Sequence, residues 1–167
     1  MPLRVAVESD LNTVIELIRG LAEYEREPDS VTLDREELRR HLFGPHPYAE
    51  VLLAETDAGE SAGFALFFHN FSTWTGKPGI YLEDLFVRPE HRSKGFGRAL
   101  LQEIAVIAIT RGCGRVEWSV LDWNAPSIAF YGSLGARPMD EWTTYRLDGE
   151  ALDRLAATPP HQRGRST

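Results

Sequence analysis

The sequence predicts an α/β (α+β) domain with a mixed central sheet, antiparallel in its first strands and completed by a parallel strand–helix–strand crossover. Two apolar runs, 49–56 and 61–71, are separated by the turn "DAGE", which is typical of a β-hairpin. Further on, a helical pattern lies between two β runs, and such a crossover pairs its strands in parallel. No internal repeat or shift in composition marks a second domain.

The first half of the chain is expected to form a strand at 3–7, two helices and the hairpin. Ser9 or Asp10 can cap the first helix, because apolar residues recur behind them at helical spacing. Asp34 caps the second helix, with Glu37 three residues further on. The apolar face of the first helix comprises Leu11, Val14, Ile15, Ile18 and Leu21.

The second half begins with the run "IYLEDLFV", residues 80–87, followed by a glycine-containing junction and a helix. A strand at 115–123, a helix capped by Asn124 and stopped by Gly135, and a last strand at 143–149 follow. We therefore expect one folded domain at 1–157. The polar end at 158–167, with two prolines, is expected to be a disordered tail.

Composition narrows the class of protein. The chain has 167 residues, of which 43% are hydrophobic and 26% charged, as is ordinary for one soluble domain. A formal net charge of -7 disfavours nucleic acid and favours a cationic or neutral small partner. One cysteine, no membrane-length apolar run and no secretory signal at the start predict a cytoplasmic protein that binds no membrane.

The junction after residue 87 has the chemistry of an anion site. A strand that enters a glycine-rich turn and then a helix exposes unpaired backbone N–H groups at the positive end of the helix dipole. Glycine allows a phosphate to approach the backbone closely. Arg92, Lys94 and Arg98 add positive charge. A P-loop and a dinucleotide-binding loop are excluded, because the required Gly-Lys-Ser/Thr and three spaced glycines are missing.

The run from Arg92 to Gly97, "RSKGFG", matches Arg/Gln-x-x-Gly-x-Gly/Ala and resembles the acetyl-CoA pyrophosphate loop of the GCN5-related N-acetyltransferase (GNAT) superfamily. The stretch "NAPSIAFYGSLGA", residues 124–136, resembles the second signature of the same superfamily. Ala136 departs from it, because most members have phenylalanine there. The resemblance covers 3–147 and implies a single GNAT-type domain with helices on both faces of the sheet.

That departure, with "YLEDLFV" and "LAEYE", resembles the diamine (spermidine/spermine) acetyltransferase branch, although related enzymes of the branch acetylate lysine-like amino acids such as thialysine. The resemblance implies acetyl-CoA as cofactor and a homodimer. Backbone N–H groups at 85–87 can polarise the thioester if the strands splay or bulge there. The predicted cofactor-binding residues are Leu85, Phe86, Val87, Arg92, Ser93, Lys94, Gly95, Phe96, Gly97, Arg98, Asn124, Ala125, Pro126 and Ser127.

Acetyl transfer to an amine needs a proton acceptor for the ammonium and a proton donor for the leaving thiolate. Glu83, a carboxylate within an apolar strand, is expected to face a cleft, bind the amine and take its proton through water. Asp84 is expected to be structural. Tyr131, in the second signature, is the general acid that the resemblance implies. As alternatives to these catalytic roles, Glu83 can be a structural carboxylate that caps nearby backbone N–H groups, and Tyr131 can be a half-buried structural tyrosine.

The amine site is expected to include Tyr24 and Glu25, in the acidic stretch "EYEREPD", and Glu117 on the neighbouring strand. Without a function, Tyr24 and Glu25 can belong to a solvated helix end, and Glu117 can be an exposed strand residue. The five histidines and Cys113 show no metal-ligand spacing, so no metal is expected. The sequence thus favours an acetyl-CoA-dependent N-acetyltransferase of small cationic amines such as polyamines, with a thialysine-type acetyltransferase or a non-catalytic acetyl-CoA-binding module as alternatives.

Overall fold

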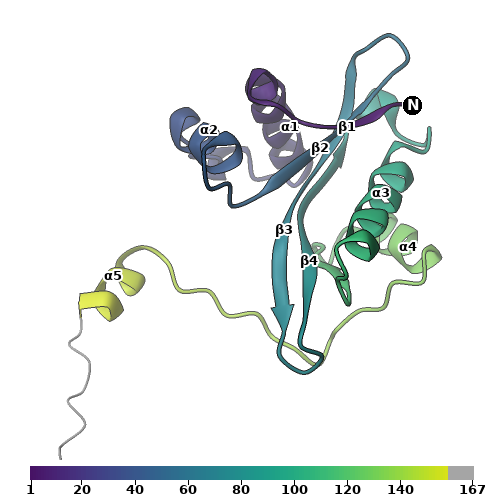
Figure 1. The fold of residues 1–167 in the computed structure, drawn as a ribbon. Helices are drawn as coiled ribbons and strands as arrows, with labels where there is room; N and C mark the ends of the chain where they lie inside the picture. Colours follow the sequence, from purple (N-terminus) through teal and green to yellow (C-terminus); the bar gives the residue numbers. More distant parts are fainter. Residues whose placement is uncertain (158–167) are drawn as a thin grey trace, which may run out of the picture. The chain divides into compact units, whose positions relative to one another are not determined.

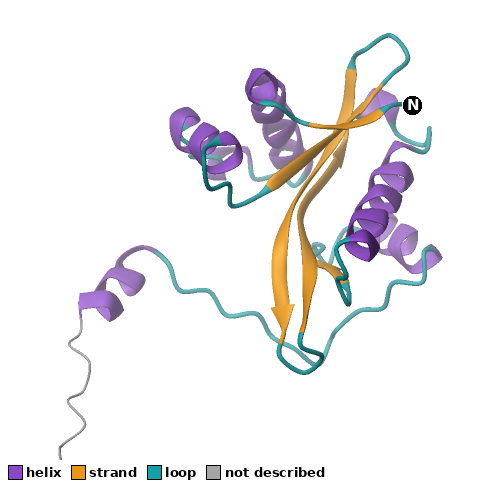
Figure 2. Ribbon diagram, viewed as in Figure 1, coloured by secondary structure: helices purple, strands orange, loops and turns teal. Residues whose placement is uncertain are grey.

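A computed structural model describes residues 1–157 of the chain. The chain divides into two compact units, Met1–Ser119 and a second unit that begins at Val120. The first unit contains a five-stranded sheet in the order β1-β2-β3-β4-β5 (Figure 2). Its strands are β1 (Leu3–Val5), β2 (Glu50–Glu55), β3 (Ser61–Ser72), β4 (Lys77–Val87) and β5 (Val116–Trp118).

The pairing of these strands confirms the predicted mixed sheet. β1 to β4 pair antiparallel, and β4 and β5 pair in parallel. The crossover between the parallel strands contains helix α3 (Phe96–Thr110). Both halves of the predicted topology are therefore present in the first unit.

Helices cover both faces of the sheet. On one face lie α1 (Leu11–Tyr24) and α2 (Arg35–Phe43), and α3 lies on the other (Figure 1). Val14, Leu17 and Leu42 of the first two helices pack into one buried cluster with sheet residues that include Leu66 and Phe86. On the opposite side α3 buries Phe96, Leu100, Leu101, Ile104 and Ala108. Apolar burial on both faces stabilises the sheet.

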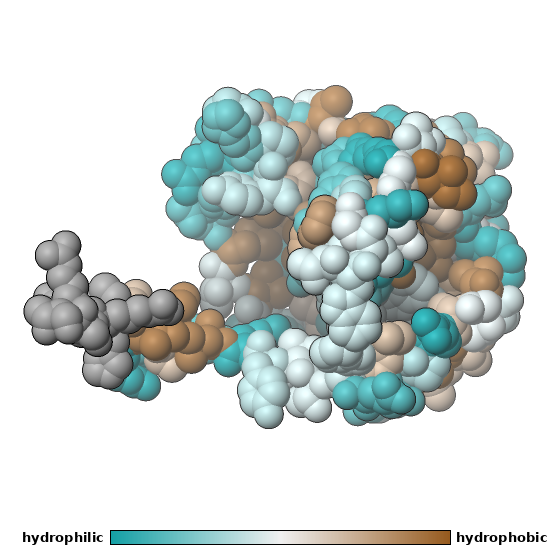
Figure 3. Space-filling view, turned by 60° about the horizontal axis from the view of Figure 1, so that its bottom comes forward, coloured by the Kyte–Doolittle hydropathy of each residue, from teal (hydrophilic) through white to brown (hydrophobic). Residues whose placement is uncertain are grey.

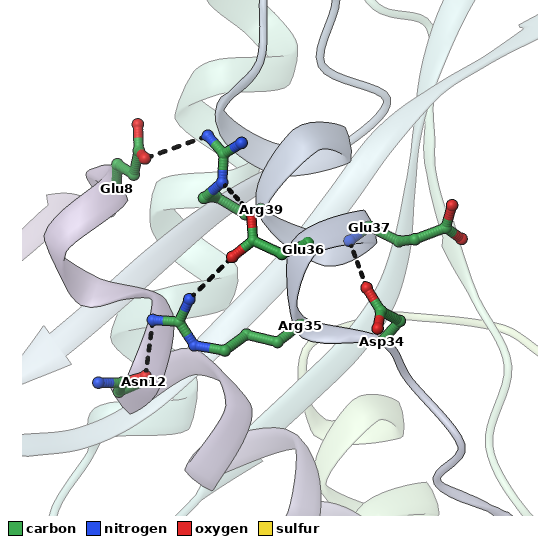
Figure 4. Close-up of polar contacts among 7 residues, drawn as sticks. All are labelled: Glu8, Asn12, Asp34, Arg35, Glu36, Glu37 and Arg39. Atoms are coloured by element: carbon green, nitrogen blue, oxygen red, sulfur yellow. Dashed lines mark hydrogen bonds and ion pairs between the residues drawn. The ribbon is translucent and has the colours of Figure 1, made fainter.

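Helix α2 begins as its sequence predicts. The N–H of Glu37 donates to the carboxylate of Asp34 at 2.9 Å (Figure 4), which satisfies one of the unpaired donors of the first turn. Two arginines of α2 then reach the start of α1: Arg35 donates to Asn12 at 3.1 Å, and Arg39 pairs with Glu8 at 3.2 Å.

Asp10 stands at the N-cap position of α1, but its side chain makes no capping hydrogen bond to that helix. Its carboxylate instead accepts the N–H of Val7 at 2.8 Å and pairs with Arg4 at 2.6 Å. The hydrogen bond from Arg4 holds the pKa of Asp10 below its usual range. The 3-10 turn Glu8–Asp10, which precedes α1, explains this difference. The Asp10 carboxylate caps this turn by accepting the N–H of Val7, so it does not cap α1.

Of the two strands predicted near the end of the chain, one is shorter than expected and the other is absent. β5 spans three residues instead of 115–123 and pairs only with residues 80–82 of β4. Residues 143–148 form no strand. Their aromatic and apolar side chains are exposed, with Tyr145 92% accessible, so the β propensity of the segment has no strand partner to support it.

The second unit contains two helices among its described residues, α4 (Ala125–Ser133) and α5 (Gly149–Ala157). Gly135, with φ of +85°, follows α4 as predicted. The sequence did not predict α5, whose Leu152 and Leu155 are exposed. Figure 3 shows brown, hydrophobic surface on the segment that leads to the grey residues. The tail predicted at 158–167 lies outside the described residues. None of the helices in 1–157 is both long and apolar enough to cross a bilayer.

Candidate active site

Strand β4 carries one extra residue opposite β3. Leu82 pairs with Phe67 and Asp84 pairs with Leu66, so Glu83 has no partner in the ladder. This is a β-bulge, the irregularity that the sequence analysis required near 85–87. It lies next to the residues with which the thioester is expected to align.

The bulge turns two consecutive acids to the same face of the sheet. Side chains alternate along a regular strand, so Glu83 lies on the same face as Tyr81. The ring of Tyr81 lies 5.3 Å from that of its partner Phe68, and Phe68 shares the face of Leu66 on β3. Asp84 shares the face of its partner Leu66, which belongs to the buried cluster under α1. Without the extra residue, Asp84 would project toward α3 with Leu82. Glu83 and Asp84 therefore both project to the face that α1 covers.

The two acids differ in environment. Glu83 is exposed and Asp84 is half-buried. No hydrogen-bond donor or cation within residues 1–157 pairs with the Asp84 carboxylate. Burial, together with the negative charges of Glu83 and Glu25, raises the pKa of Asp84 from 3.8 to about 7. A carboxyl group with this pKa exchanges its proton near neutral pH.

The C-terminal end of α1 brings the third acid, Glu25. The helix ends at Tyr24, and Arg26 adopts the left-handed conformation with φ of 67°. The N–H of Glu27 then donates back to the carbonyl oxygen of Ala22 at 2.9 Å, as in a Schellman-type end. Glycine usually occupies such a position, so the arginine backbone is strained there. Burial raises the pKa of Glu25 as well.

Beyond the bulge, one edge of β4 has no neighbouring strand in the first unit. The N–H of Arg88 donates to the carbonyl oxygen of Ala62, toward β3, at 2.8 Å. Since successive N–H groups of a strand point to opposite edges, those of Leu85 and Val87 point away from β3. β5 pairs only as far as Leu82. The splaying predicted from the sequence is therefore present, and Leu85 and Val87 offer backbone donors along it.

The junction between β4 and α3 forms the expected concave backbone. Ser93 has φ of 61° and Gly95 has φ of 90°, and Lys94 between them is not left-handed. Alternating hand turns successive N–H groups to the same side and forms an anion-binding nest. Gly95 is the N-cap of α3, no side chain caps the helix, and its first turn contains no acid. The first N–H groups of α3 add to this site.

The space at Gly97 fits a phosphate group. Its φ is not left-handed, and a Cβ built there would meet only Val87 Cγ2, at 3.8 Å. Neither backbone conformation nor packing in this chain therefore requires glycine at 97. A close ligand explains it, because a side chain would fill the space in front of the N–H groups. The residues present thus fit the pyrophosphate of acetyl-CoA.

The side chains at the predicted cofactor site differ in exposure and in their contacts. Phe96 and Phe86 are buried and offer only backbone groups, whereas Ser93, Lys94 and Arg98 are exposed. Arg92 donates from Nε to the carbonyl oxygen of Val87 at 3.1 Å. Its guanidinium carbon lies 4.4 Å from the ring centroid of Tyr24. One ring face of Tyr24, which the sequence analysis assigned to a substrate ammonium, is thus covered by Arg92.

Glu117 lies on β5, opposite Tyr81. Its Oε2 accepts a hydrogen bond from Asn70 Nδ2 at 2.8 Å and pairs with Arg115 Nε at 2.8 Å. These contacts tie β5 to the β3–β4 hairpin. A role for Glu117 in amine binding stays a prediction.

Asn124, Ala125, Pro126, Ser127 and Tyr131 lie in the second unit. Asn124 is buried, and its Oδ1 accepts the N–H of Ser127 at 3.3 Å, which confirms it as the cap of α4. Pro126 stands in the first turn, as is favourable. Tyr131 is half-buried on α4, with its ring 5.5 Å from that of Phe130. The contacts of these residues with a cofactor remain predictions.

The sequence predicted a structural role for Asp84 and gave no sign that its carboxylate has no hydrogen-bond donor or cation beside it in the described part of the chain. The two acids in the apolar run 80–87 do not by themselves predict a bulge, because the sequence does not show which strand residue is left unpaired. Within residues 1–157 no three His, Cys, Asp or Glu side chains form a metal-binding group.

The bulged β4, the splayed edge and the anion nest before α3 together form the core of an acyl-CoA-dependent transferase. The sequence profile of the Acetyltransferase (GNAT) family matches residues 12–136. The chain belongs to this family of acetyltransferases.

Two relatives and one solved structure are similar to this chain over most of its length. Thialysine N-epsilon-acetyltransferase of Sus scrofa is 39% identical, over 92% of this chain and 96% of its own length. Spermidine/spermine N(1)-acetyltransferase-like protein 1 of Homo sapiens is 32% identical, over 92% of this chain and 23% of that protein. An integron cassette protein from V. cholerae has the same fold, with a TM-score of 0.77 and 28% identity, over 94% of this chain and 98% of that one.

Proposed function

We propose that this chain transfers the acetyl group of acetyl-CoA to a terminal primary amine of a small cationic molecule. The observation that carries the proposal is the pair of adjacent carboxylates, Glu83 and Asp84, which the bulge of β4 turns to the face covered by α1, where the charge of Glu25 also acts on Asp84. Acids from a strand and from a helix end create a negative field that attracts an ammonium group. The nearby edge and nest supply donors for the acyl donor.

Each step has a candidate group. Acetyl-CoA, when bound, supplies an activated acetyl thioester. The N–H groups of Leu85 and Val87 orient and polarise its carbonyl, and the nest at 93–97 holds phosphate. Glu83, exposed at the bulge, receives the substrate ammonium. Tyr131 donates its phenolic proton to the departing sulfur, because the two groups have similar basicity.

The substrate class is a lysine-like amino acid or a polyamine. A thialysine-type substrate is the better supported of the two, because the similarity to the Sus scrofa enzyme extends over 96% of that protein. Both types carry an alkylammonium that the three acids can bind. A homodimer and a cytoplasmic location, both expected from the sequence analysis, belong to the same proposal, and sedimentation of the purified chain tests the first.

The test is release of the thiol of CoA in the presence of a panel of amines. Thialysine, lysine, ornithine, spermidine, spermine and putrescine are compared at equal concentration, with N-acetylated thialysine as a control that lacks the free terminal amine. We expect release with at least one cationic amine and none with the control. Tight acetyl-CoA binding without turnover on any amine would support a non-catalytic binding module instead.

A further inference from the structure

Polar side chains from three segments meet on the sheet just before the bulge of β4. We propose that Asn70, Arg115 and Glu117 form a second subsite, which binds the α-ammonium and α-carboxylate of a lysine-like amino acid while its terminal amine lies at the bulge. This inference rests on the proposed function and decides between the two substrate classes named there. Glu117 is expected from the sequence beside the reacting amine, and the subsite instead lies at the other end of the substrate.

A glycine on the middle strand allows side chains of β3 and β5 to meet. Gly79 of β4 pairs with Asn70 of β3, and a Cβ at 79 would collide with Asn70 Oδ1. Asn70 therefore extends across β4, and its Nδ2 donates to Glu117 Oε2 at 2.8 Å. Arg115, two residues before Glu117 and so on the same face, pairs with this oxygen through Nε at 2.8 Å.

This arrangement leaves atoms of both charges available to a ligand. Both contacts of Glu117 use Oε2, so Oε1 remains an acceptor, and the Arg115 guanidinium has no second hydrogen-bond or ion-pair partner in residues 1–157. The side chains of Arg115 and Glu117 are 41% and 36% exposed. A guanidinium beside a carboxylate matches the two charges of a zwitterion. The distal end of a polyamine carries only positive charge, which Arg115 would repel.

Asn70 occupies its position at a cost in stability. Its Oδ1 is enclosed and accepts no hydrogen bond from any residue in 1–157. A buried acceptor without a donor destabilises a fold, and such exceptions are typical of residues that serve a functional site. The group that Asn70 orients is the Glu117 carboxylate. Asn70 is therefore a positioning residue of the subsite.

The distance from the subsite to the bulge fits the length of a lysine-like chain. Glu117 lies opposite Tyr81, and Glu83 follows Tyr81 by two residues on the same face. With a rise of about 3.3 Å per residue and a strand spacing of about 4.8 Å, the two acids lie roughly 8 Å apart along the sheet. The two nitrogens of an extended lysine-like amino acid are about 7 Å apart. One substrate can therefore reach both positions.

Aromatic rings form the surface between these positions. Tyr81 and Phe68 lie on the same face of the sheet, with their ring centroids 5.3 Å apart, and both are half-buried. The Tyr81 hydroxyl shares a hydrogen bond of 2.8 Å with Ser119 Oγ, which orients the ring. Methylene groups of the substrate would bury apolar surface against these rings.

The experiment compares thialysine with two truncated forms, one without the α-carboxylate and one without the α-ammonium. Arg115→Gln should lower kcat/KM about tenfold to a hundredfold for the two substrates that carry the carboxylate, and spare the decarboxylated form. Glu117→Gln should cause a similar loss for the two that carry the α-ammonium, and spare the deaminated form. Both losses should appear in KM, because this end of the substrate does not react.

Arg111→Gln is the matched control. It breaks an arginine–carboxylate pair of similar exposure in the same unit, with Glu50 as the partner, so any effect should be equal for the three substrates. Equal losses for all three substrates in Arg115→Gln and Glu117→Gln would make the two residues a brace of the sheet and overturn the subsite. A wild type that acetylates the decarboxylated form as well as thialysine would also overturn it and leave the proposed function intact.

Calorimetry with the protein loaded with CoA provides a readout independent of turnover. The wild type should bind thialysine more tightly than either truncated form, and Arg115→Gln should abolish the difference between thialysine and the decarboxylated form. Equal affinity of the wild type for all three would overturn the subsite. Failure of the wild type to acetylate any amine would overturn the proposed function instead, and the binding measurements would still test the subsite.

Discussion

The guanidinium carbon of Arg92 lies 4.4 Å from the centroid of the Tyr24 ring, so the loop before α3 rests on the last residue of α1. Arg92 also donates to the carbonyl oxygen of Val87 at 3.1 Å. One side chain thus connects the nest, the open edge of β4 and the helix end that carries Glu25.

Removal of the Tyr24 ring should weaken acetyl-CoA binding. A cation–π contact of this kind contributes about 0.5–1 kcal/mol at exposed sites, equivalent to roughly a twofold to fivefold change in Kd. We expect this increase for Tyr24→Leu and a smaller one for Tyr24→Phe, which keeps the ring. Isothermal titration with acetyl-CoA measures both. Equal Kd values for the two variants would show that the stacking does not position Arg92.

Gly97→Val should raise the Kd for acetyl-CoA far more than Lys94→Ala, because the nest binds mainly through backbone donors. Packing tolerates a Cβ at 97, since its nearest neighbour would be Val87 Cγ2 at 3.8 Å. The loss should therefore appear in binding and not in folding, which circular dichroism checks. Small and equal effects of the two variants in calorimetry would remove the phosphate-loop assignment.

Asp84→Asn should stabilise the first unit at pH 8 more than at pH 5. The pKa of Asp84 is raised to about 7 by burial and by Glu83 and Glu25, so its contribution to stability is fully present below the unfolded pKa of about 4 and is lost as the pH rises through 7. For a half-buried group we expect a difference of about 1–3 kcal/mol between the two pH values. Urea unfolding measures it, with Glu60→Gln as control, because Glu60 is exposed and is not among the charges that raise this pKa. A variant with the same pH dependence as wild type would contradict the raised pKa.

Gly63→Ala should destabilise the β3–β4 pair. A Cβ at 63 would collide with the carbonyl oxygen of Phe86, a backbone atom, so the two strands would have to shift apart. The expected loss is about 2–4 kcal/mol. Gly114→Ala is the matched control in the same unit, because its Cβ would make only ordinary contacts, the nearest at 3.6 Å. If urea unfolding gives the same free energy for both variants, the close approach of β3 and β4 is not as tight as described.

Tyr131→Phe should slow the chemical step and spare cofactor affinity. It removes the phenolic proton and keeps the ring against Phe130. We expect a hundredfold to ten-thousandfold loss in single-turnover rate. Thioesters with a more acidic thiol need less protonation and should lose less. The same factor for every thioester would make Tyr131 a positioning residue.

Much of the fold could be predicted, because hydrophobic period and turn chemistry specify local structure. The Asp34 cap, the stop at Gly135 and the hairpin of β2 and β3 follow from residues a few positions apart. The strand predicted at 143–149 was wrong, since its aromatic residues have β propensity but no partner strand. Pairing is a tertiary property that one segment does not reveal.

The site was predictable to the level of motifs. Arg92 to Gly97 and the helix capped by Asn124 follow from their glycines and their cap. Which acid is exposed could not be predicted, because a bulge shifts every later side chain to the opposite face. Glu83 and Asp84 are adjacent in sequence, and only the register with Leu66 and Phe67 distinguishes them.

The central claim is that acetyl passes directly from acetyl-CoA to a cationic amine bound beside β4. The most direct measurement combines CoA release with the intact mass of the protein, after mixing with acetyl-CoA alone and with acetyl-CoA plus thialysine or spermidine. The account predicts an unmodified protein in both mixtures, with CoA and N-acetylated amine formed in equal amounts only when amine is present. An acetylated protein without amine, or no CoA release with any cationic amine, would contradict it.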